Sequence, residues 1–195
     1  MTSQAGLTEM NKLIVPREIR RVYDGRIFSV QVETLTLPKG HVMKAEIIRH
    51  PGSVVIIPIT DSGQLILVRQ YRPAIGRFAW ELPAGSLKPS EDVQGAARRE
   101  CQEEIGLVPS TLTLLGSFFP TPGYCDEEMH FYRADGLREP TAEETAHPDE
   151  DEDIETKAFS AADVRRMIAT GEVIDLKTVG GLALLDPSTR LGAGR

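Results

Sequence analysis

The sequence predicts an α+β fold in which a mixed β-sheet lies between helices, preceded by a small antiparallel β section. Strand-like apolar segments recur along the chain and alternate with a few helical segments, which is typical of such a layered arrangement. The first 50 residues contain strand-like patterns without a helical one. Hydrophobic residues make up 41% of the 195 residues and charged residues 26%, so the chain can bury a sizeable core.

The N-terminal quarter of the chain predicts strands. We expect residues 1–16 to form a flexible leader. Residues 17–50 are expected to form the small β section, because residues 26–37 alternate apolar and polar side chains with period two. The stretch 38–41 (PKGH) then turns the chain, and residues 43–50 return as a second strand.

The main domain is expected over residues 51–186. Residues 52–60 (GSVVIIPIT) form a nearly continuous apolar run, typical of a strand buried on both faces. Residues 61–63 (DSG) form a turn and residues 64–71 the next strand, so these two strands are predicted to pair as a hairpin. Residues 72–85 are then expected to form a loop.

A helix is predicted after this loop. Ser90 is its expected N-cap, with Glu91 and Asp92 placing negative charge at the positive end of the helix dipole. The helix should run to about Ile105, and Gly106 suits its C-terminal cap.

The rest of the chain predicts shorter elements and an acidic loop. Helices are expected from Ser160 or Ala161 to Ala169 and from Asp175 to Leu185, and residues 187–195 should form a mobile tail. The strands are predicted at residues 111–119, 129–134 and 154–159, with a polar loop at 136–152.

Charge and cysteine usage narrow the class of protein. The net charge is -7 and the pI about 5.2, which disfavours a nucleic-acid partner because its phosphates would be repelled. Two cysteines, Cys101 and Cys125, do not make a disulfide framework, so a reducing cytoplasm is the simplest expectation. We see no signal peptide and no apolar stretch long enough to span a membrane.

Three carboxylates are placed together by the predicted helix. Glu100, Glu103 and Glu104 stand at i, i+3 and i+4, on one face and one turn apart. Such a group repels itself unless it faces water or a hard divalent cation such as Mg²⁺. By itself the cluster is more simply a solvated helix face.

The residues around this cluster match a longer motif. The segment 85–107 reads GSLKPSEDVQGAARRECQEEIGL, with an apolar type of residue at Cys101 and at Leu107. This pattern resembles the Nudix box of the Nudix hydrolase family. The seven fixed positions are Gly85, Glu91, Arg99, Glu100, Glu103, Glu104 and Gly106.

The resemblance implies a role for each box residue. Glu100 and Glu104 would be the principal metal ligands at a diphosphate, and Glu103 would support catalysis or bind a further ion. Ala84 would lend its backbone carbonyl to a metal, where Gly85 allows close backbone approach. The implied cofactor is Mg²⁺, with Mn²⁺ as an alternative.

The other box residues are implied to be structural. Arg99 and Glu91 resemble the family's ion pair that orients the helix, and Gly106 ends the helix. Cys101 stands where the family more often has an aliphatic residue, so we expect it to pack in the core as a small hydrophobe.

Segments outside the box resemble the ADP-ribose pyrophosphatase branch of the family. They lie on both sides of the box, and Pro122 follows Gly106 by 16 residues. The resemblance covers roughly residues 18–185. The segments are 23–28 (YDGRIF), 49–52 (RHPG), 70–85 (QYRPAIGRFAWELPAG), 121–127 (TPGYCDE) and 171–178 (GEVIDLKT).

This branch implies a homodimer whose subunits exchange their leading β sections and share each active site. Phe28 or Tyr23 would stack on adenine, and Arg49, Arg72 and Glu81 would contact the remainder of the substrate. The structural alternative stays open, because aromatic residues on strands are often core and arginines often form surface salt bridges.

The acidic loop 147–154 (HPDEDEDI) is by composition a solvated loop. In the resembled branch, a glutamate of the corresponding loop closes over the substrate and activates water. Glu150 is the implied general base, and Glu152 is the alternative base or an additional metal ligand.

These implications predict Mg²⁺-dependent hydrolysis of a nucleoside diphosphate-sugar, with ADP-ribose giving AMP and ribose 5-phosphate. One alternative is another nucleotide sugar, such as GDP-mannose or ADP-glucose. Another is a regulator that binds ADP-ribose without cleaving it, which would predict a broken box or an added DNA-binding domain.

Overall fold

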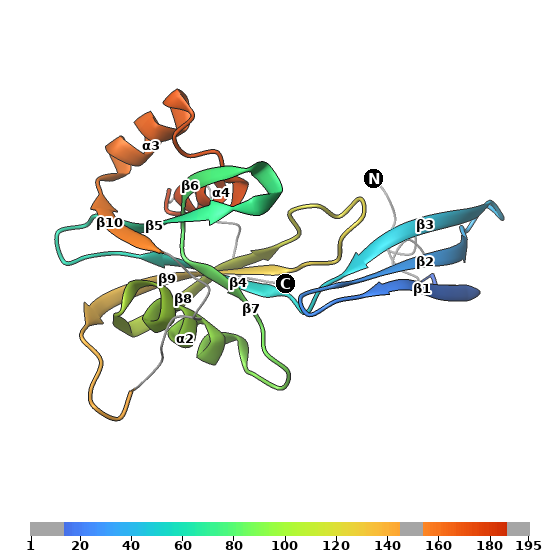
Figure 1. The fold of residues 1–195 in the computed structure, drawn as a ribbon, viewed down its shortest axis with the longest axis horizontal. Coiled ribbons are helices and arrows are strands. Elements are labelled where there is room, and N and C mark those ends of the chain that lie inside the picture. The colour runs from blue at the N-terminus through green and yellow to red at the C-terminus, as the bar shows by residue number, and fades with distance from the viewer. Residues whose placement is uncertain (1–13, 145–153, 187–195) are drawn as a thin grey trace, which may run out of the picture. The chain divides into compact units, whose positions relative to one another are not determined.

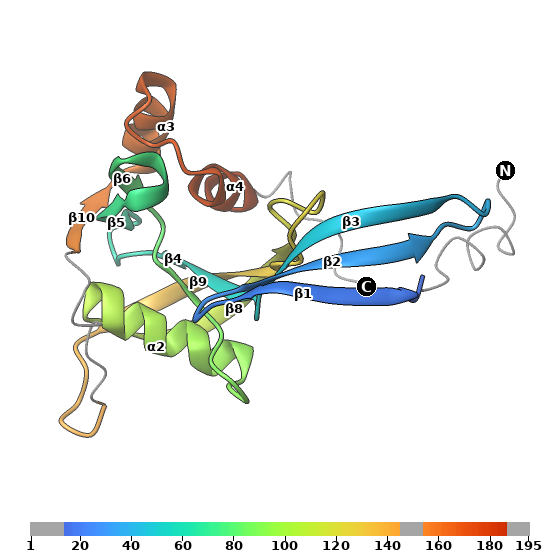
Figure 2. The ribbon, with the colours of Figure 1, turned by 45° about the vertical axis from the view of Figure 1, so that its right-hand side comes forward.

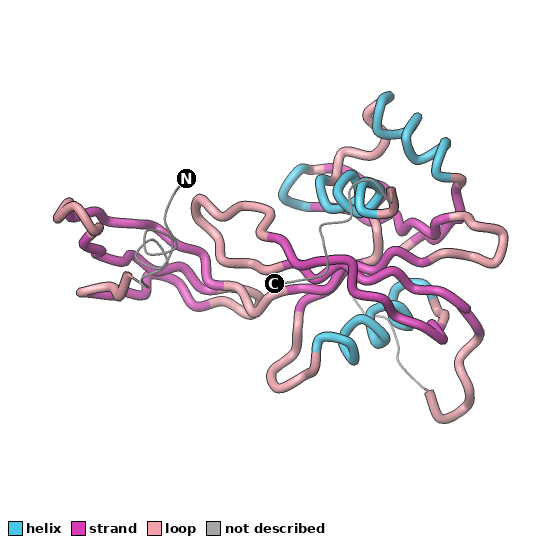
Figure 3. Tube along the Cα trace, turned by 180° about the vertical axis from the view of Figure 1, so that it is seen from behind, coloured by secondary structure: helices cyan, strands magenta, loops and turns pink. Residues whose placement is uncertain are grey.

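A computed structural model of the chain describes residues 14–144 and 154–186. They divide into two compact units. The first unit comprises residues 14–50 and 121–126; the second comprises residues 51–120, 127–144 and 154–186. Figure 3 shows that the described part of the first unit is built of strands and loops, whereas the second combines strands with helices.

The first unit is a three-stranded antiparallel sheet in the order β1-β2-β3. The predicted antiparallel β section is therefore confirmed, but its first strand, β1, was not predicted as a separate strand. Residues 38–40 form the predicted turn between β2 and β3. The segment 121–126 joins this unit through backbone hydrogen bonds with Ile48, which donates to Tyr124 (2.8 Å) and accepts from Asp126 (3.2 Å). The strands are β1 (Glu18–Asp24), β2 (Ser29–Thr36) and β3 (Val42–Arg49).

The second unit contains two sheets rather than one. The larger has the order β7-β4-β9-β8 and is mixed, because β4 and β9 run parallel while the other pairs are antiparallel. The smaller is antiparallel, in the order β10-β5-β6. Their strands are β4 (Ser53–Pro58), β5 (Leu65–Arg72), β6 (Arg77–Glu81), β7 (Ala84–Ser86), β8 (Val108–Phe118), β9 (Met129–Arg138) and β10 (Glu155–Phe159), with a short 3₁₀ helix η1 (Pro73–Ile75) between β5 and β6.

Helices lie on both sides of the mixed sheet, as Figures 1 and 2 show. Alternate residues of β4 contribute to two hydrophobic clusters, as expected for a strand buried on both faces. Val54 and Ile56 pack against α2 (Val93–Ile105), whereas Val55 and Ile57 share a cluster with residues of α3 (Ala161–Thr170) and α4 (Leu176–Leu184). The predicted α+β arrangement of helices around a mixed sheet is therefore confirmed.

The predicted hairpin of β4 and β5 is wrong in its pairing. The turn at 61–63 is present, but beyond a single bridge between Ile59 and Leu65 the two strands enter different sheets. β4 pairs with β7 and β9, whereas β5 pairs with β6 and β10. A strand buried on both faces finds its partners from the whole fold, which a local pattern does not reveal.

Three predicted element ends also need correction. The expected loop at 72–85 contains η1, β6 and β7, and β9 continues to Arg138 instead of ending at 134. The N-cap of α2 is Asp92, whose carboxylate accepts a hydrogen bond from the Gly95 backbone N–H at 2.8 Å, and not Ser90, which has a φ of 64°. Both residue types favour caps, so the sequence alone did not distinguish them. The predicted cap at Gly106 is confirmed, with a φ of 72°.

Candidate metal and diphosphate site

Helix α2 presents two buried carboxylates one turn apart. Glu100 and Glu104 are only 7% and 6% exposed, because their face of the helix packs towards β7 and β4. The Ala84 backbone N–H donates a hydrogen bond to Glu104 Oε2 at 3.0 Å. The loop residue predicted to carry the metal-binding carbonyl therefore lies directly against a predicted metal ligand.

Gly85 lies against the second of these carboxylates. A Cβ placed on Gly85 would come 2.0 Å from Glu100 Cδ, so any side chain there would displace the Glu100 carboxylate. Glycine at this position therefore lets the Glu100 carboxylate lie directly against the backbone.

Arg99 organises the remaining acidic groups of the box. Its Nε and Nη2 donate to the two oxygens of Glu91 at 2.7 and 2.8 Å, and its Nη1 donates to Glu100 (2.5 Å) and Glu103 (2.6 Å). The hydrogen bonds from Arg99 are the main cause of the lowered pKa of Glu91, while these carboxylates raise the pKa of Arg99. Arg99 and Glu91 thus form the ion pair that the resemblance implied, which anchors α2 to the segment before it.

The donor chemistry of this cluster fits a hard divalent cation. Three carboxylates and a backbone carbonyl are the oxygen ligands that Mg²⁺ and Mn²⁺ accept. Within residues 14–144 and 154–186, three ligand side chains do not yet converge into one shell. Since Arg99 holds both Glu100 and Glu103, these carboxylates would turn from Arg99 towards Glu104 to bind an ion.

A cavity of about 470 Å³, lined by both apolar and polar side chains, opens beside β7, which contacts the glutamates. Ala84, Gly85 and Ser86 of β7 form part of its wall. The cavity is large enough for part of a nucleotide, and one wall is continuous with the acidic box. Its polar side chains are Ser53, Arg72, Glu81, Glu127, Asp175 and Lys177.

Arg72 and Glu81 meet in this cavity. Arg72 Nε donates to Glu81 Oε1 at 2.9 Å, and Arg72 Nη2 donates to Oε2 at 2.7 Å. Lys177 also donates to Glu81 Oε2 and forms an ion pair with Asp175 Oδ2 at 3.0 Å. Burial favours a raised pKa for Glu81, but the hydrogen bonds from Arg72 and the charge of Lys177 outweigh it, so the pKa is lowered and the group is ionised.

Sequence reasoning placed Arg72 and Glu81 as substrate contacts but gave no role to four other cavity residues. Ser53 Oγ donates to Glu127 at 2.8 Å, and Lys177 and Asp175 come from the start of α4. Three of these residues stand in segments whose resemblance was noted, and a lysine in a mainly apolar helix was the available signal. Ser53 and Glu127 are 74 residues apart in sequence, and Lys177 and Glu81 are 96 apart, which no local pattern shows.

The other proposed substrate contacts belong to the first unit. Phe28 and Tyr23 are 39% and 54% exposed, with ring centroids 5.8 Å apart. Arg49 is engaged within its own unit, where it donates to Glu33 and, at 2.8 Å, to Asp126. The structure therefore shows a salt-bridge role for Arg49, and its substrate role stays a prediction.

Two further predictions have different outcomes. Glu150 and Glu152, the proposed bases, lie outside the described residues. Cys101 is fully buried in the cluster beneath α2, and burial raises the pKa of its thiol to about 12. Its predicted role as a small core hydrophobe is therefore confirmed, since an un-ionised thiol is a poor nucleophile.

None of the helices in the described ranges has the length and apolar character of a membrane span.

Glu100 and Glu104 of α2 lie against Gly85 and Ala84 of β7, beside a cavity that contains Arg72 and Lys177. This arrangement suits a protein that processes phosphate groups with the help of a divalent cation. Comparison with known sequences identifies its family. The NUDIX domain pattern matches residues 49–178, so the chain belongs to the Nudix hydrolase family, as the box predicted.

The relatives support the same assignment. The chain is 34% identical to the ADP-ribose pyrophosphatase of Bacillus subtilis over 89% of its length and 92% of that protein. It is 36% identical to the methanol dehydrogenase activator of Bacillus methanolicus, over 87% and 92%. A crystal structure of an ADP compounds hydrolase shares the fold, with a TM-score of 0.75 and 24% identity, over 89% of this chain and 92% of that one.

Proposed function

We propose that this protein hydrolyses the diphosphate bond of ADP-ribose to AMP and ribose 5-phosphate, with Mg²⁺ or Mn²⁺ as cofactor. The observation that carries the proposal is the placement of Glu100 and Glu104, both buried, against β7, whose residues also line the cavity. The likeness to the ADP-ribose pyrophosphatase of Bacillus subtilis over nearly the whole chain supports the substrate.

Each residue of the site has a distinct task in this proposal. Glu100, Glu104 and the Ala84 carbonyl would hold the cation, with Glu103 as a further ligand. A bound divalent cation supplies positive charge that neutralises the diphosphate and activates it for attack. Arg72 would donate to a phosphate or ribose oxygen, which suits the planar guanidinium.

The proton from the attacking water needs an acceptor. We assign this role to Glu150, with Glu152 as the alternative, on the resemblance of the loop 147–154. Replacing each separately by glutamine would decide between them: the variant of the true base should lose most of its kcat while its KM changes little.

The test of the function is a panel of substrates with Mg²⁺. ADP-ribose, GDP-mannose, ADP-glucose, NADH and a nucleoside triphosphate are incubated with the protein, and products are separated by ion-exchange chromatography. ADP-ribose should be cleaved fastest, with AMP and ribose 5-phosphate in equal amounts. Faster cleavage of another nucleotide sugar would refute ADP-ribose as the preferred substrate. Binding of ADP-ribose without cleavage would favour the alternative that the protein is a non-catalytic regulator.

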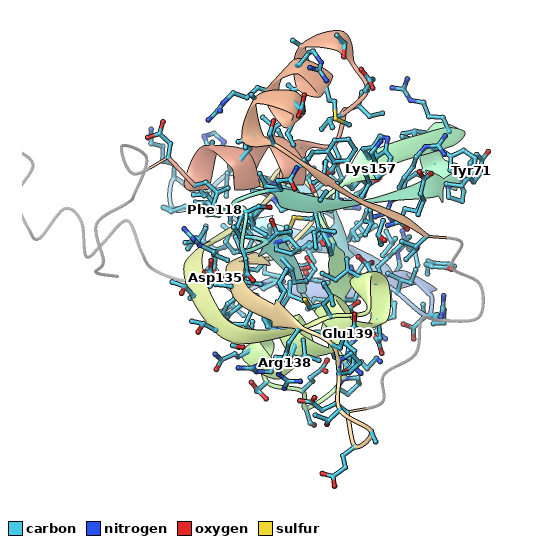
Figure 4. The ribbon with its side chains drawn as sticks, turned by 90° about the vertical axis from the view of Figure 1, so that its left-hand side faces the viewer. Tyr71, Phe118, Asp135, Arg138, Glu139 and Lys157 are labelled. Carbon is cyan, nitrogen blue, oxygen red and sulfur yellow. The ribbon has the colours of Figure 1, made fainter. Side chains whose placement is uncertain are left out.

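A matched pair of variants tests the metal ligands. Glu104→Gln should reduce turnover by about three orders of magnitude, since it removes a charged ligand where the reaction needs charge stabilisation. Glu139→Gln, at an exposed position after β9 (Figure 4), should keep wild-type turnover. Both variants should unfold within a few degrees of the wild type, and wild-type turnover by Glu104→Gln would refute the assignment.

We further propose that the protein acts in the cytoplasm as a homodimer with a small-molecule nucleotide sugar as its ligand. Support for a dimer comes from the first unit, which exposes apolar side chains that a second copy could cover: Ile19, Val22, Tyr23, Ile27, Phe28, Val42 and Met43. Light scattering after size-exclusion chromatography should give twice the mass of one chain. Ile19→Lys combined with Val42→Lys should give a monomer, and an unchanged mass would refute this surface.

A further inference from the structure

Lys177 is a buried cation that none of the roles above explains. It is 9% exposed and sits in the first turn of α4. Removing an ammonium group from water is unfavourable unless carboxylates pair with it. Lys177 has two such partners: Glu81, at the end of β6, and Asp175, the N-cap of α4.

These contacts tie α4 to the strand that supplies Glu81. Asp175 Oδ2 accepts hydrogen bonds from the Thr178 backbone N–H (3.0 Å) and from Thr178 Oγ1 (2.7 Å). Thr178 Oγ1 in turn accepts from the Leu82 backbone N–H at 2.8 Å. Lys177 therefore pairs with carboxylates from the end of β6 and the start of α4, two segments that the Leu82–Thr178 hydrogen bond already holds together. Its Nζ consequently has little freedom to move.

The position of Glu81 in turn sets the orientation of Arg72. Because the guanidinium makes a two-point contact with the carboxylate, rotation of the carboxylate plane would rotate the guanidinium with it. Oε2 of Glu81 accepts from both Arg72 and Lys177. Among the described residues, Arg72 Nη1 donates to no protein oxygen, which leaves it able to donate to a ligand.

We propose that Lys177 is a positioning residue: by fixing the carboxylate of Glu81 it holds the Arg72 guanidinium in the orientation that binds the phosphate or ribose of the substrate. This rests on the proposed function, since it concerns the same cavity. Glu81 then acts on the substrate through Arg72, because its buried oxygens already accept from two cations and an anionic ligand would be repelled by direct contact.

A double-mutant cycle tests the chain of contacts. Binding of α,β-methylene ADP-ribose, which cannot be hydrolysed between its phosphorus atoms, is measured by titration calorimetry with Mg²⁺ for wild type, Lys177→Met, Arg72→Met and the double variant. Each single variant should bind about tenfold more weakly. The double variant should bind within about twofold of Arg72→Met, since contacting residues are not additive.

Controls separate this effect from loss of charge or of folding. Lys157→Met removes an exposed lysine of β10 in the same unit, labelled in Figure 4, and should leave binding unchanged. Asp175→Asn keeps a side-chain oxygen that can cap α4 but removes the negative charge that pairs with Lys177. It should therefore weaken binding of the analogue less than Lys177→Met does. This effect should also disappear in the Arg72→Met background. This variant keeps the test open if Lys177→Met does not fold.

The outcomes distinguish the two proposals. Equal weakening by Lys177→Met with and without Arg72 would mean that Lys177 contacts the ligand itself, and unchanged binding in both Lys177→Met and Asp175→Asn would mean that it has no role. Either result overturns the positioning role while the proposed function stands. A wild type that neither binds the analogue nor cleaves any nucleotide sugar overturns both.

Discussion

The two units of the chain are stabilised in different ways. Among the described residues, every buried hydrophobic side chain belongs to the second unit, where two hydrophobic clusters lie on the two faces of β4. The first unit buries polar side chains instead: Gln31 and Glu33 are 8% and 2% exposed. Gln31 donates to Glu33 at 2.6 Å, and Arg49 joins Glu33 to Asp126.

This difference separates a unit that carries its own core from one that does not. Burial of apolar surface is the main favourable contribution to folding, so the second unit has the larger share of the stability. A three-stranded sheet with a polar centre and exposed apolar side chains depends on directional contacts and on whatever covers it. Mutations in the two units should therefore have different costs.

The largest effect is expected in the core of the second unit. Ile57 is fully buried, so Ile57→Ala should lower the free energy of unfolding by about 2–5 kcal/mol, through lost burial and the cavity left behind. Leu114, which is 51% exposed in the same unit, is the control: Leu114→Ala should stay within about 0.5 kcal/mol. Denaturant titration measures both. Similar costs for the two would contradict the assigned core.

An intermediate effect is expected at the polar centre of the first unit, which consists of Gln31, Glu33, Arg49 and Asp126. Arg49→Met leaves the buried Glu33 without its cation and should cost about 1–3 kcal/mol, at the lower end because Arg49 itself is 38% exposed. Arg21→Met, which removes an exposed pair with Asp24, should cost below about 0.5 kcal/mol. If Arg49→Met costs no more than Arg21→Met, the polar centre does not stabilise the unit.

The smallest effect is the dependence of that centre on pH. Burial favours a raised pKa for Asp126, but the hydrogen bonds from Arg49 and the His50 backbone N–H outweigh it, so the pKa is lowered. Because the pKa of Asp126 is lower in the folded chain than in the unfolded chain, where it is near 4, ionised Asp126 stabilises the fold at pH values above about 4. This stabilisation is lost as the pH falls through the pKa of the folded chain.

Asp126→Asn should therefore flatten the acid side of the stability curve between about pH 5 and pH 3, by less than about 1 kcal/mol because the side chain is 37% exposed. Urea titrations at several pH values measure this. The matched control Asp61→Asn, in the exposed turn before β5, should leave the slope unchanged. A curve that Asp126→Asn leaves as steep as in the wild type would show that the pair with Arg49 contributes nothing.

The sequence predicted those parts of the site whose residues lie close together along the chain. Glu100, Glu103, Glu104, Arg99 and Glu91 fall within one helix and the segment before it, so their spacing determined which side chains could meet. The pairing of β4 and β5 did not follow, because strand partners come from distant segments and both strands look alike locally.

By itself the sequence indicated the family through the box, the acidic face of α2 and a small antiparallel β section at the N-terminus. Only the tertiary structure decided that Lys177 and Asp175 join Arg72 and Glu81 in one cavity, and that Arg49 is held by Glu33 and Asp126. The physical reason is the distance along the chain over which each effect acts. Helical periodicity and backbone sterics act over a few residues, whereas a buried charge is neutralised by whichever partner the packed fold brings within hydrogen-bonding distance.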